Sequence, residues 1–527
     1  MPPDLHPTVH RTRRKRWRNF HDTVAQTVVQ LVDVWNARPN AASFPSYNAT
    51  TAALQGLIGE ALRDGLRIRA LGGGWSFSPA AATDGILVNT RPLNYQFSLA
   101  DQNTHADYGG AAADLVFAQC GVSVAELNVA LRQRGKSLPT SGASNGQTIA
   151  GALSTGTHGS AIDQGGLQDL VRALHLVTGP DRHVWLERAS APTLSDASVA
   201  FLGAEVVRDD ALFDAALVSF GSFGIVHGVV LEVDDLFYVQ EYRRQHAESP
   251  ATWAAIEHFD LSGLRGLGRP APVRPYFFQA VFNPYDRRDG PYLTVMYRED
   301  ARPAGCPSPT PSTGWRPGDS AADVIGRITD VSSAITPTLV NALFPQQYPD
   351  VDGVCGTWGE MFGDTGLGGR AASTAMGIPM DRVREAVEAL FELNETRTIP
   401  GLFALRYVRG SRAPLAFTRH APHTCVLEVD GAYSRRMLRF YDAAWQHLMD
   451  LGIPVTFHWG KMLPLRADWV RPSYGDEAVD AWLTARETLL PTPALRDAFA
   501  NEMLEQIGLD GPPHRAPQAP RRTLASG

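Results

Sequence analysis

Three consecutive glycines, Gly72, Gly73 and Gly74, form the stretch of this chain best suited to hold a ligand. They lie in RALGGGWSFSP, residues 69–79, directly after an apolar run that predicts a strand. Glycine has no Cβ, so its backbone can adopt positive φ and bring N–H groups close to an anion. The loop is therefore a candidate cradle for a pyrophosphate, and the alternative is an ordinary turn.

The residues after these glycines exclude a Rossmann dinucleotide fingerprint. That motif requires a helix directly after its glycines. Here Pro79 and a small-residue loop follow, and then a second apolar run, residues 85–89. Strand, glycine loop and strand predict a different architecture.

A second segment, Leu138–Ser160, has the composition to line a flat ligand. It reads LPTSGASNGQTIAGALSTGTHGS and contains five glycines among Ser, Thr, Asn and Gln. Its hydroxyls and amides offer hydrogen bonds, and Ile149–Leu153 predicts a packed helical turn, which argues against a loose surface loop. A third glycine-bearing piece, residues 219–226, runs into the predicted strand 229–233.

The totals place the chain among ordinary globular proteins. It has 527 residues, 44% hydrophobic and 20% charged, so more than one domain is expected. The net charge of −7 argues against a nucleic-acid surface as a main partner, and no apolar run is long enough to predict a membrane span. The basic stretch 11–18, RTRRKRWR, is interpreted as a solvated face.

Four cysteines, Cys120, Cys306, Cys355 and Cys425, are scattered along the chain. None forms a C-x-x-C pair and their spacings fit no zinc site. We therefore expect free thiols in a reducing, cytoplasmic compartment, and no metal site.

The periodicity of apolar residues predicts an α+β protein. A polar arm with a short helix is expected over 1–35, and a capped helix over 124–134, where Ser123 and Glu126 form a capping box. Further helices are predicted at 50–65, 322–335, 382–393, 436–451 and 493–507, and strands at 66–71, 114–121, 170–177, 238–244, 276–282, 292–297, 402–409, 424–429 and 455–458. After residue 236, strands and helices alternate in the manner of an antiparallel sheet that carries helices.

Four motifs in this order resemble one family. They are Gly72–Ser76, residues 147–159 (QTIAGALSTGTHG), residues 221–226 (GSFGIV) and residues 458–461 (HWGK). Together they resemble the vanillyl-alcohol-oxidase-type FAD-dependent oxidoreductases, and within these the aldonolactone and alditol oxidases such as L-gulonolactone oxidase. The resemblance is good over about residues 40–235 and again at 458–461.

The resemblance implies a two-lobed FAD-binding domain over 36–235 and an α+β substrate cap over 236–454. Residues 1–35 would be an N-terminal arm, 455–509 would return to the flavin, and 510–527 would be a disordered tail. FAD would contact Gly72, Gly73, Gly74, Trp75, Ser76, Ser141, Gly142, Ser144, Asn145, Thr148, Gly151, Ser154, Gly156, His158, Ile225 and Lys461, with Val226 beside Ile225 at the adenine.

The residue at position 75 departs from the family. Many relatives carry a histidine there that bonds covalently to the flavin, whereas this chain has Trp75, and residues 140–160 contain no cysteine for a second bond. An indole cannot form the histidyl bond. We therefore expect FAD to be held non-covalently.

A second departure lies on the predicted cap strand. Relatives that oxidise polyols or lactones carry Glu-x-Arg there, and this chain has Ala404 and Arg406. Glu428 lies in an otherwise apolar strand, TCVLEV, so it either faces the pocket and replaces that carboxylate or faces water. Arg406 is a candidate to orient the substrate oxygen, and a surface arginine is the alternative.

The motif HWGK supplies the other candidates for catalysis. Lys461 would stabilise negative charge that develops at the flavin, or it is a lysine at a strand end. His458 is either a base or a core histidine bonded to the backbone.

These residues predict oxidation of a CH–OH group in a sugar-like or other hydroxylated molecule, with O2 reduced to H2O2. The alternatives are a dehydrogenase of the same fold with another electron acceptor, or a secondary-metabolism flavoenzyme for oxidative cyclisation or desaturation. A flavin-binding protein without turnover and a carbohydrate-binding module complete the set.

Overall fold

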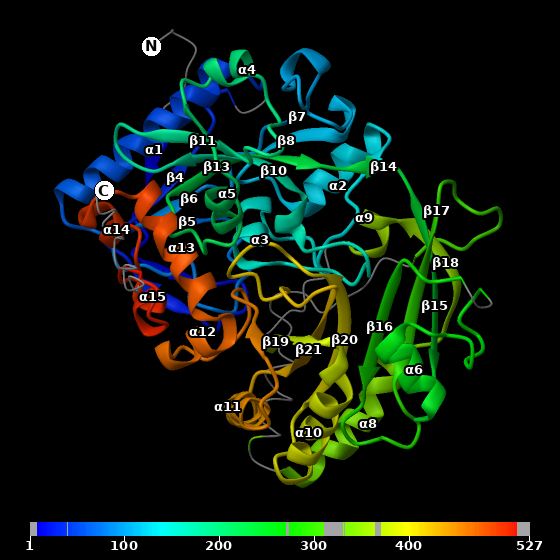
Figure 1. The fold of residues 1–527 in the computed structure, drawn as a ribbon. Helices are drawn as coiled ribbons and strands as arrows, with labels where there is room; N and C mark the ends of the chain where they lie inside the picture. Colours follow the sequence, from blue (N-terminus) through cyan, green and yellow to red (C-terminus); the bar gives the residue numbers. More distant parts are fainter. Residues whose placement is uncertain are drawn as a thin grey trace, which may run out of the picture.

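Two separate sheet systems organise the chain in the computed structural model, which describes residues 8–38, 41–269, 273–309, 330, 333–363 and 370–513 (Figure 1). The first, coloured blue to green, comprises a four-stranded and a six-stranded sheet. The second is one eight-stranded sheet, coloured green to orange. The prediction of an α+β fold with a two-lobed first domain and an antiparallel cap is confirmed.

The four-stranded sheet ends at the glycine loop. Its order is β1-β4-β6-β5, with β5 (Ile68–Leu71) and β4 (Gln30–Val34) both parallel to β6 (Ile86–Asn89). The predicted strand 66–71 is thus present, and α1 (Phe44–Arg63) precedes it.

The helix expected within residues 1–35 is wrong. This region forms four strands: β1 (Val9–Arg11), β2 (Arg16–Arg18), β3 (Ala25–Thr27) and β4. β4 lies inside the sheet between β1 and β6, and the adjacent Leu31 and Val32 are both buried, so its short apolar run resembles a buried helical turn in sequence. The basic stretch is exposed at Arg16 and Arg18, but Trp17 between them is buried.

The six-stranded sheet carries the second ligand loop. Its order is β12-β11-β10-β13-β8-β7. The strands are β7 (Gln96–Ser98), β8 (Leu115–Gln119), β10 (Val171–Val177), β11 (His183–Glu187), β12 (Glu205–Arg208) and β13 (Ile225–Glu232). The capping box is confirmed, because Ser123 and Glu126 exchange hydrogen bonds of 2.8 and 3.2 Å at the start of α2 (Val124–Gln133). The helical turn predicted in the second loop is α3 (Ile149–Thr155).

The eight-stranded sheet, which we call the cap sheet, is antiparallel throughout, in the order β18-β15-β17-β16-β20-β21-β19-β22. Its strands are β15 (Tyr238–Gln245), β16 (Phe277–Phe282), β17 (Tyr292–Glu299), β18 (Val351–Thr357), β19 (Ala371–Pro379), β20 (Gly401–Arg409), β21 (His423–Ala432) and β22 (Thr456–Phe457).

The two faces of the cap sheet have different partners. One face packs into the main core with α6 (Pro250–His258), α10 (Val383–Thr396) and α11 (Arg435–Asp450). On the other face Phe344 of α8 (Thr336–Gln347) covers part of the sheet. Most of the helix predicted at 322–335 lies outside the described residues.

The last part of the chain returns to the first lobe, where α14 (Pro493–Ala498) packs against α1 (Figure 1). The single helix predicted at 493–507 is wrong, because it breaks between α14 and α15 (Glu502–Gln506). Asn501 causes the break: its side-chain oxygen caps α15, and its amide nitrogen donates to the carbonyls of Pro79, Ala80 and Ala82 at 3.1, 3.2 and 3.0 Å. Residues 514–527 of the expected disordered tail lie outside the described residues.

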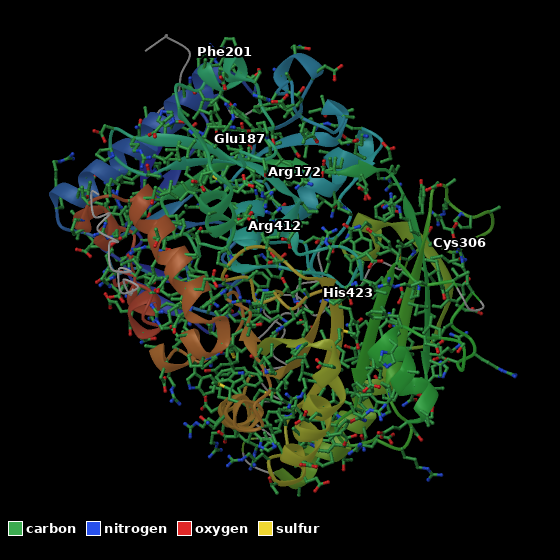
Figure 2. All side chains as sticks on the ribbon, viewed as in Figure 1. Arg172, Glu187, Phe201, Cys306, Arg412 and His423 are labelled. Atoms are coloured by element: carbon green, nitrogen blue, oxygen red, sulfur yellow. A yellow bond between two sulfur atoms is a disulfide. The ribbon has the colours of Figure 1, made fainter. Side chains whose placement is uncertain are left out.

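The expectation of four free thiols is wrong for two of them. Cys306 and Cys355 form a disulfide across 49 residues, and Figure 2 shows Cys306 at the outer edge of the cap sheet. Cys120 and Cys425 are free and buried. Because disulfides persist in oxidising compartments, the cysteine pattern gives no support for a reducing one. No helix in the described part of the chain has the length and apolar content that crossing a bilayer requires.

A buried hydrogen-bond network crosses the core of the first domain. His227 donates from Nδ1 to the Thr51 hydroxyl at 3.1 Å and accepts at Nε2 from Gln119 at 3.0 Å. Burial, with a smaller contribution from the nearby His183, lowers the pKa of His227 to about 3. The imidazole is therefore neutral in the folded protein near pH 7.

This neutral histidine makes stability depend on pH. The unfolded chain binds the proton near pH 6.5 and the folded chain near 3, so the contribution of His227 is complete above 6.5 and falls as the pH drops. Between pH 7 and 5 we expect His227 to account for a loss of about 2 kcal/mol in unfolding free energy. Urea denaturation at pH 7 and at pH 5 measures this difference in unfolding free energy, which should be smaller in His227→Gln than in the unmodified protein. The difference should remain in His10→Gln, which alters an exposed histidine.

Candidate active site

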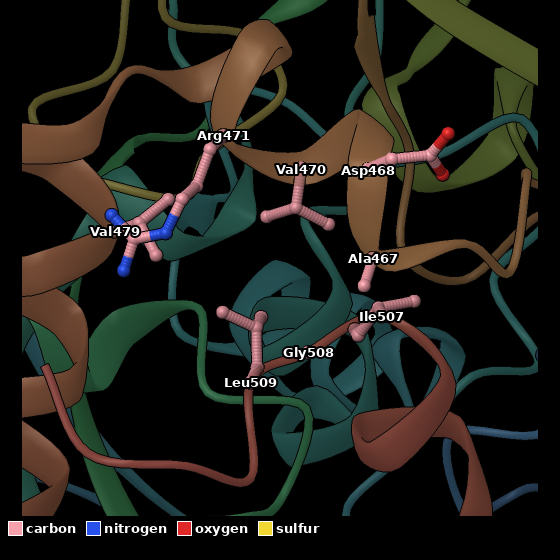
Figure 3. Close-up of a pocket in the computed structure, with 8 residues that line it drawn as sticks. All are labelled: Ala467, Asp468, Val470, Arg471, Val479, Ile507, Gly508 and Leu509. Carbon is pink, nitrogen blue, oxygen red and sulfur yellow. The ribbon is translucent and has the colours of Figure 1, made fainter. Parts of the chain in front are cut away.

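A cavity of about 1220 Å³ lies between the glycine loop, the second ligand loop, the cap sheet and residues 458–461. This exceeds the usual 300–1,000 Å³ of a small-molecule pocket and leaves room for a cofactor together with a substrate. A smaller hollow of about 340 Å³ lies between α12 (Ala467–Tyr474) and residues 507–509 (Figure 3). It contains none of the residues predicted for the site.

The glycine loop meets the second ligand loop without room for side chains. A Cβ added to Gly72 would lie 2.0 Å from Thr148 Oγ1, and one added to Gly73 would lie 2.9 Å from the Gly146 carbonyl oxygen. Gly74 has a φ of +69°, which favours glycine. The bare backbone therefore forms the wall of the cavity at this point.

Two buried polar atoms on this wall lack a partner. Within the described residues, Thr148 Oγ1 and Gln147 Oε1 make no hydrogen bond, and both residues line the cavity. Buried polar atoms are nearly always paired, so these two point to a polar ligand. The glycine backbone fits the phosphates of FAD, and the unpaired Thr148 hydroxyl and Gln147 amide oxygen fit its hydroxyls.

Trp75 packs beside the cavity in an aromatic cluster. Its ring stacks on Phe20 with centroids 4.0 Å apart at 13°, and a Cβ on Gly146 would lie 2.2 Å from it. His21 lies edge-on to Trp75 at 5.8 Å, stacks on Phe77 and also lines the cavity. Trp75 thus occupies space between the two loops as a packing group.

His21 was not predicted from the sequence. It is only 6% exposed, and its Nδ1 has no hydrogen-bond partner among the described residues. Burial and the nearby charge of Lys461 lower its pKa to about 4. It lies within residues 1–35, which were expected to form a polar arm with a short helix, and a single histidine there gives no signal of burial.

Most predicted FAD contacts line the cavity. They are Gly72, Gly73, Gly74, Trp75, Ser76, Gly142, Ser144, Thr148, Gly151, Ser154, His158 and Lys461. Four do not line it, because other interactions hold them. Ser141 accepts from the Trp358 indole at 2.8 Å, and Asn145 donates to the Phe362 carbonyl. Gly156 ends α3 with a φ of 82°, and Ile225 packs in a core behind the wall.

The structure brings the four predicted catalytic residues to the cavity wall. Glu428 is 1% exposed, and Lys461 Nζ donates to its Oε1. Arg406 Nε lies 3.0 Å from Glu428 Oε2. Of the two orientations open to Glu428, the structure has the one toward the pocket.

Sheet register explains this position. Glu428 on β21 lies directly opposite Ala404 on β20, so the carboxylate stands one strand away from the alanine. Opposed side chains share a face, and Arg406 follows two residues after Ala404 on that same face.

The charges of this cluster set its protonation. Burial opposes ionisation of Glu428, but Arg406 and Lys461 outweigh it and hold the pKa of the carboxyl well below its usual range. Although Arg406 Nε and Glu428 Oε2 are close, neither has hydrogen-bond geometry with any described partner. This ion pair therefore retains hydrogen-bonding capacity toward the cavity.

Asp430 is the acid that sequence reasoning missed in this cluster. It accepts a hydrogen bond from Ser373, lies 3.8 Å from Lys461 Nζ and lines the cavity. Burial and the neighbouring Glu428 raise its pKa, against the pull of Lys461. Its spacing of two from Glu428 was the available signal, because strand residues i and i+2 share a face.

Two neutral histidines complete the wall. His458 accepts from the Gly460 amide at 2.9 Å, so its own proton is on Nε2. His158 donates to the Gly159 carbonyl at 3.0 Å, and its Nε2 lies 3.9 Å from Glu428. Burial lowers the pKa of both, to about 4 for His158 and well below the ordinary value for His458, where His158 and Lys461 add to it.

Two hydrogen bonds join the glycine loop to the 458–461 segment. The Phe77 amide donates to the Gly460 carbonyl at 2.8 Å, and the Ser78 hydroxyl donates to the Trp459 carbonyl at 2.5 Å. Residues nearly 400 positions apart thus form one continuous wall, in which Lys461 is fixed relative to the cradle.

Comparisons with known proteins agree with this geometry. A family model described as an FAD binding domain matches residues 47–186. L-gulono-1,4-lactone dehydrogenase of Mycobacterium tuberculosis is 25% identical over 471 residues, covering 86% of this chain and 94% of the relative. L-gulonolactone oxidase of Bos taurus is 27% identical over 175 residues, covering 32% of this chain and 33% of the relative.

Solved structures share the fold at low identity. Cholesterol oxidase from B. sterolicum aligns with a TM-score of 0.70 at 15% identity, covering 96% of this chain and 99% of that one. A VAO-type flavoprotein from Myceliophthora thermophila aligns with a TM-score of 0.56 at 14% identity, covering 88% and 78%. Residues 47–186 therefore match an FAD binding domain, and the chain shares the fold of the vanillyl-alcohol-oxidase-type flavoproteins. It is an FAD-binding oxidoreductase related in sequence to the aldonolactone oxidases and dehydrogenases.

The contact between Gly72 and Thr148 gives a test of the cradle. We expect Gly72→Ala to weaken FAD binding about 10-fold or more, because its Cβ would overlap Thr148 Oγ1. Adding Thr148→Ala should restore part of the affinity, since the nearest remaining atom would be 3.1 Å away. Flavin fluorescence titration of the apoprotein measures this. Gly56→Ala, with open space around its Cβ, is the matched control, and equal affinity in Gly72→Ala and Gly56→Ala would contradict the cradle.

Proposed function

We propose that this protein oxidises a CH–OH group of a small hydroxylated molecule. The observation that carries the proposal is the buried cluster of Arg406, Glu428 and Lys461, with unfilled hydrogen-bonding capacity, on the same cavity as the FAD cradle. A cation pair held by a carboxylate is suited to an oxygen that becomes more negative as the reaction proceeds.

The cofactor would be held by backbone and small polar groups. Gly72–Ser76 would face its pyrophosphate, and Thr148, Ser154 and His158 its ribityl chain and ring. When bound, FAD supplies a hydride acceptor at N5.

Each charged residue then has a role at the substrate. Arg406 faces the substrate oxygen and stabilises its alkoxide character, while Glu428 Oε2 accepts a hydrogen bond from the substrate hydroxyl. Lys461, held by Glu428, would supply a positive charge beside the bound cofactor. The hydroxyl proton goes to the neutral His158, whose unprotonated Nε2 lies 3.9 Å from Glu428, and His458 lies beside it at a ring distance of 5.6 Å.

The electron acceptor that we propose is O2, reduced to H2O2. Relatives carry both names, dehydrogenase for the M. tuberculosis protein and oxidase for the bovine one, so the second candidate is transfer to another acceptor. Timing the reoxidation of reduced protein in air distinguishes the two. Oxidative cyclisation or desaturation is a third candidate, which the loss of the Glu-x-Arg glutamate at Ala404 favours.

Removing Arg406 tests the function. We expect Arg406→Ala to slow anaerobic flavin reduction by substrate about 100-fold while FAD stays bound, because one group that stabilises the developing charge is lost. Arg409→Ala is the matched control, since Arg409 is exposed and alternation turns it to the opposite face of β20. The measurement is stopped-flow absorbance near 450 nm, the generic flavin band. An unchanged rate in Arg406→Ala would remove Arg406 from the site.

The second part of the proposal is that FAD is held without a covalent bond. Trp75 stands at the position where many relatives carry the bonding histidine, and its indole is stacked on Phe20. Acid precipitation should therefore release all flavin to the supernatant. Flavin retained in the pellet would contradict this, and loss of that retention in His21→Ala would identify His21 as the point of attachment.

A further inference from the structure

We infer that the substrate is an alcohol whose reacting end is polar and whose body is apolar. This inference rests on the proposed function and concerns the same site. It comes from the part of the cavity that faces the cap sheet, away from the FAD cradle.

One wall of this part is the apolar side of α8. Leu339, Val340, Leu343 and Phe344 line the cavity from this helix. The first three are only partly buried in the protein itself, so they present apolar surface to whatever occupies the cavity. None of these four side chains can form a hydrogen bond, whereas Gln346 and Gln347, which line the cavity from the last turn of α8, can.

The facing walls are apolar too. Val351 and Val354 from β18, Met361 from α9 (Trp358–Met361) and Leu402 from β20 line the cavity opposite or beside α8. An occupant that passes between these side chains removes apolar surface from water on several sides.

Ala404 is buried behind this apolar surface and does not line the cavity itself. It packs in one cluster with Val281, Tyr292 and Phe344 of α8. Relatives that act on polyols or lactones are expected to have a glutamate at this position, inside the pocket. In this chain the carboxylate is on the neighbouring strand, at Glu428, directly opposite Ala404. Phe344 of α8 packs against Ala404.

A second charged pair on the cap side, Arg243 and Glu241, is largely engaged with neighbouring residues. Arg243 donates to Glu241, to the Thr294 hydroxyl at 3.1 Å and to the Pro349 carbonyl at 3.3 Å. In the sheet register, three strand spacings separate Arg243 from Arg406, about 14 Å. Among the described residues of the cap sheet that line the cavity, the buried polar atoms without a hydrogen bond are Arg406 Nε and Glu428 Oε2, at one end of the chamber.

A polyol and an apolar alcohol would meet this chamber differently. Each hydroxyl buried against α8 without a partner costs roughly 10-fold in affinity. Each methylene buried there gains about fourfold. The chamber therefore favours one hydroxyl at the ionic cluster and a hydrocarbon body along α8.

The test measures binding and reduction separately on the holoenzyme. Straight-chain primary alcohols of increasing length are compared with alditols of the same carbon number, by calorimetric titration and by anaerobic stopped-flow reduction. We expect the dissociation constant of the alcohols to fall up to about fourfold per methylene and the alditols to bind far more weakly. Leu343→Gln should flatten this dependence on length. Ala342→Gln, an exposed neighbour on the same helix, should leave it unchanged.

Different results would contradict the apolar substrate body and the proposed oxidation of a CH–OH group. Alditols that bind as tightly as the alcohols, or a length dependence that Leu343→Gln leaves intact, would overturn the apolar body. Steep length dependence in binding without flavin reduction by any alcohol would support the chamber and overturn the oxidation of a CH–OH group.

Discussion

The buried carboxylate of Glu428 is the interaction on which the site depends. It lies between Arg406 and Lys461 at 1% exposure, so two cations from different parts of the chain share one anion. Removing one partner of a buried ion pair typically costs about 3–5 kcal/mol, because the other charge is left uncompensated. These two ion pairs thus fix β20, β21 and the 458–461 segment relative to one another and hold two positive charges on the cavity wall.

The fold delivers these groups from distant segments. Backbone hydrogen bonds join the glycine loop to the 458–461 segment, and Asn501 ties the C-terminal helices to the carbonyls of residues 79–82. The cofactor cradle and Lys461 therefore share one rigid wall, which is what charge stabilisation at a fixed position requires.

The cap sheet separates packing from chemistry by the alternation of its strands. Residues of one parity enter the main core with α10 and α11, and residues of the other parity form the cavity wall. Exchanging a carboxylate between β20 and β21 keeps it on that wall, because Ala404 and Glu428 are register partners. With the small Ala404 in place of a glutamate, Phe344 of α8 can pack against β20, which changes the surface that a substrate contacts.

Local sequence determined much of this protein. Glycine spacing, the capping box at Ser123 and the alternation of the cap strands predicted the elements, because these signals depend on neighbouring residues alone. The order of the four motifs along the chain predicted an FAD-binding protein. The strands within residues 9–34, the break at Asn501 and the Cys306–Cys355 disulfide depend on partners far along the chain and could not be predicted in this way. The orientation of Glu428 and the burial of His21 were likewise decided by tertiary structure, since a side chain's face is fixed only when its strand is paired and covered.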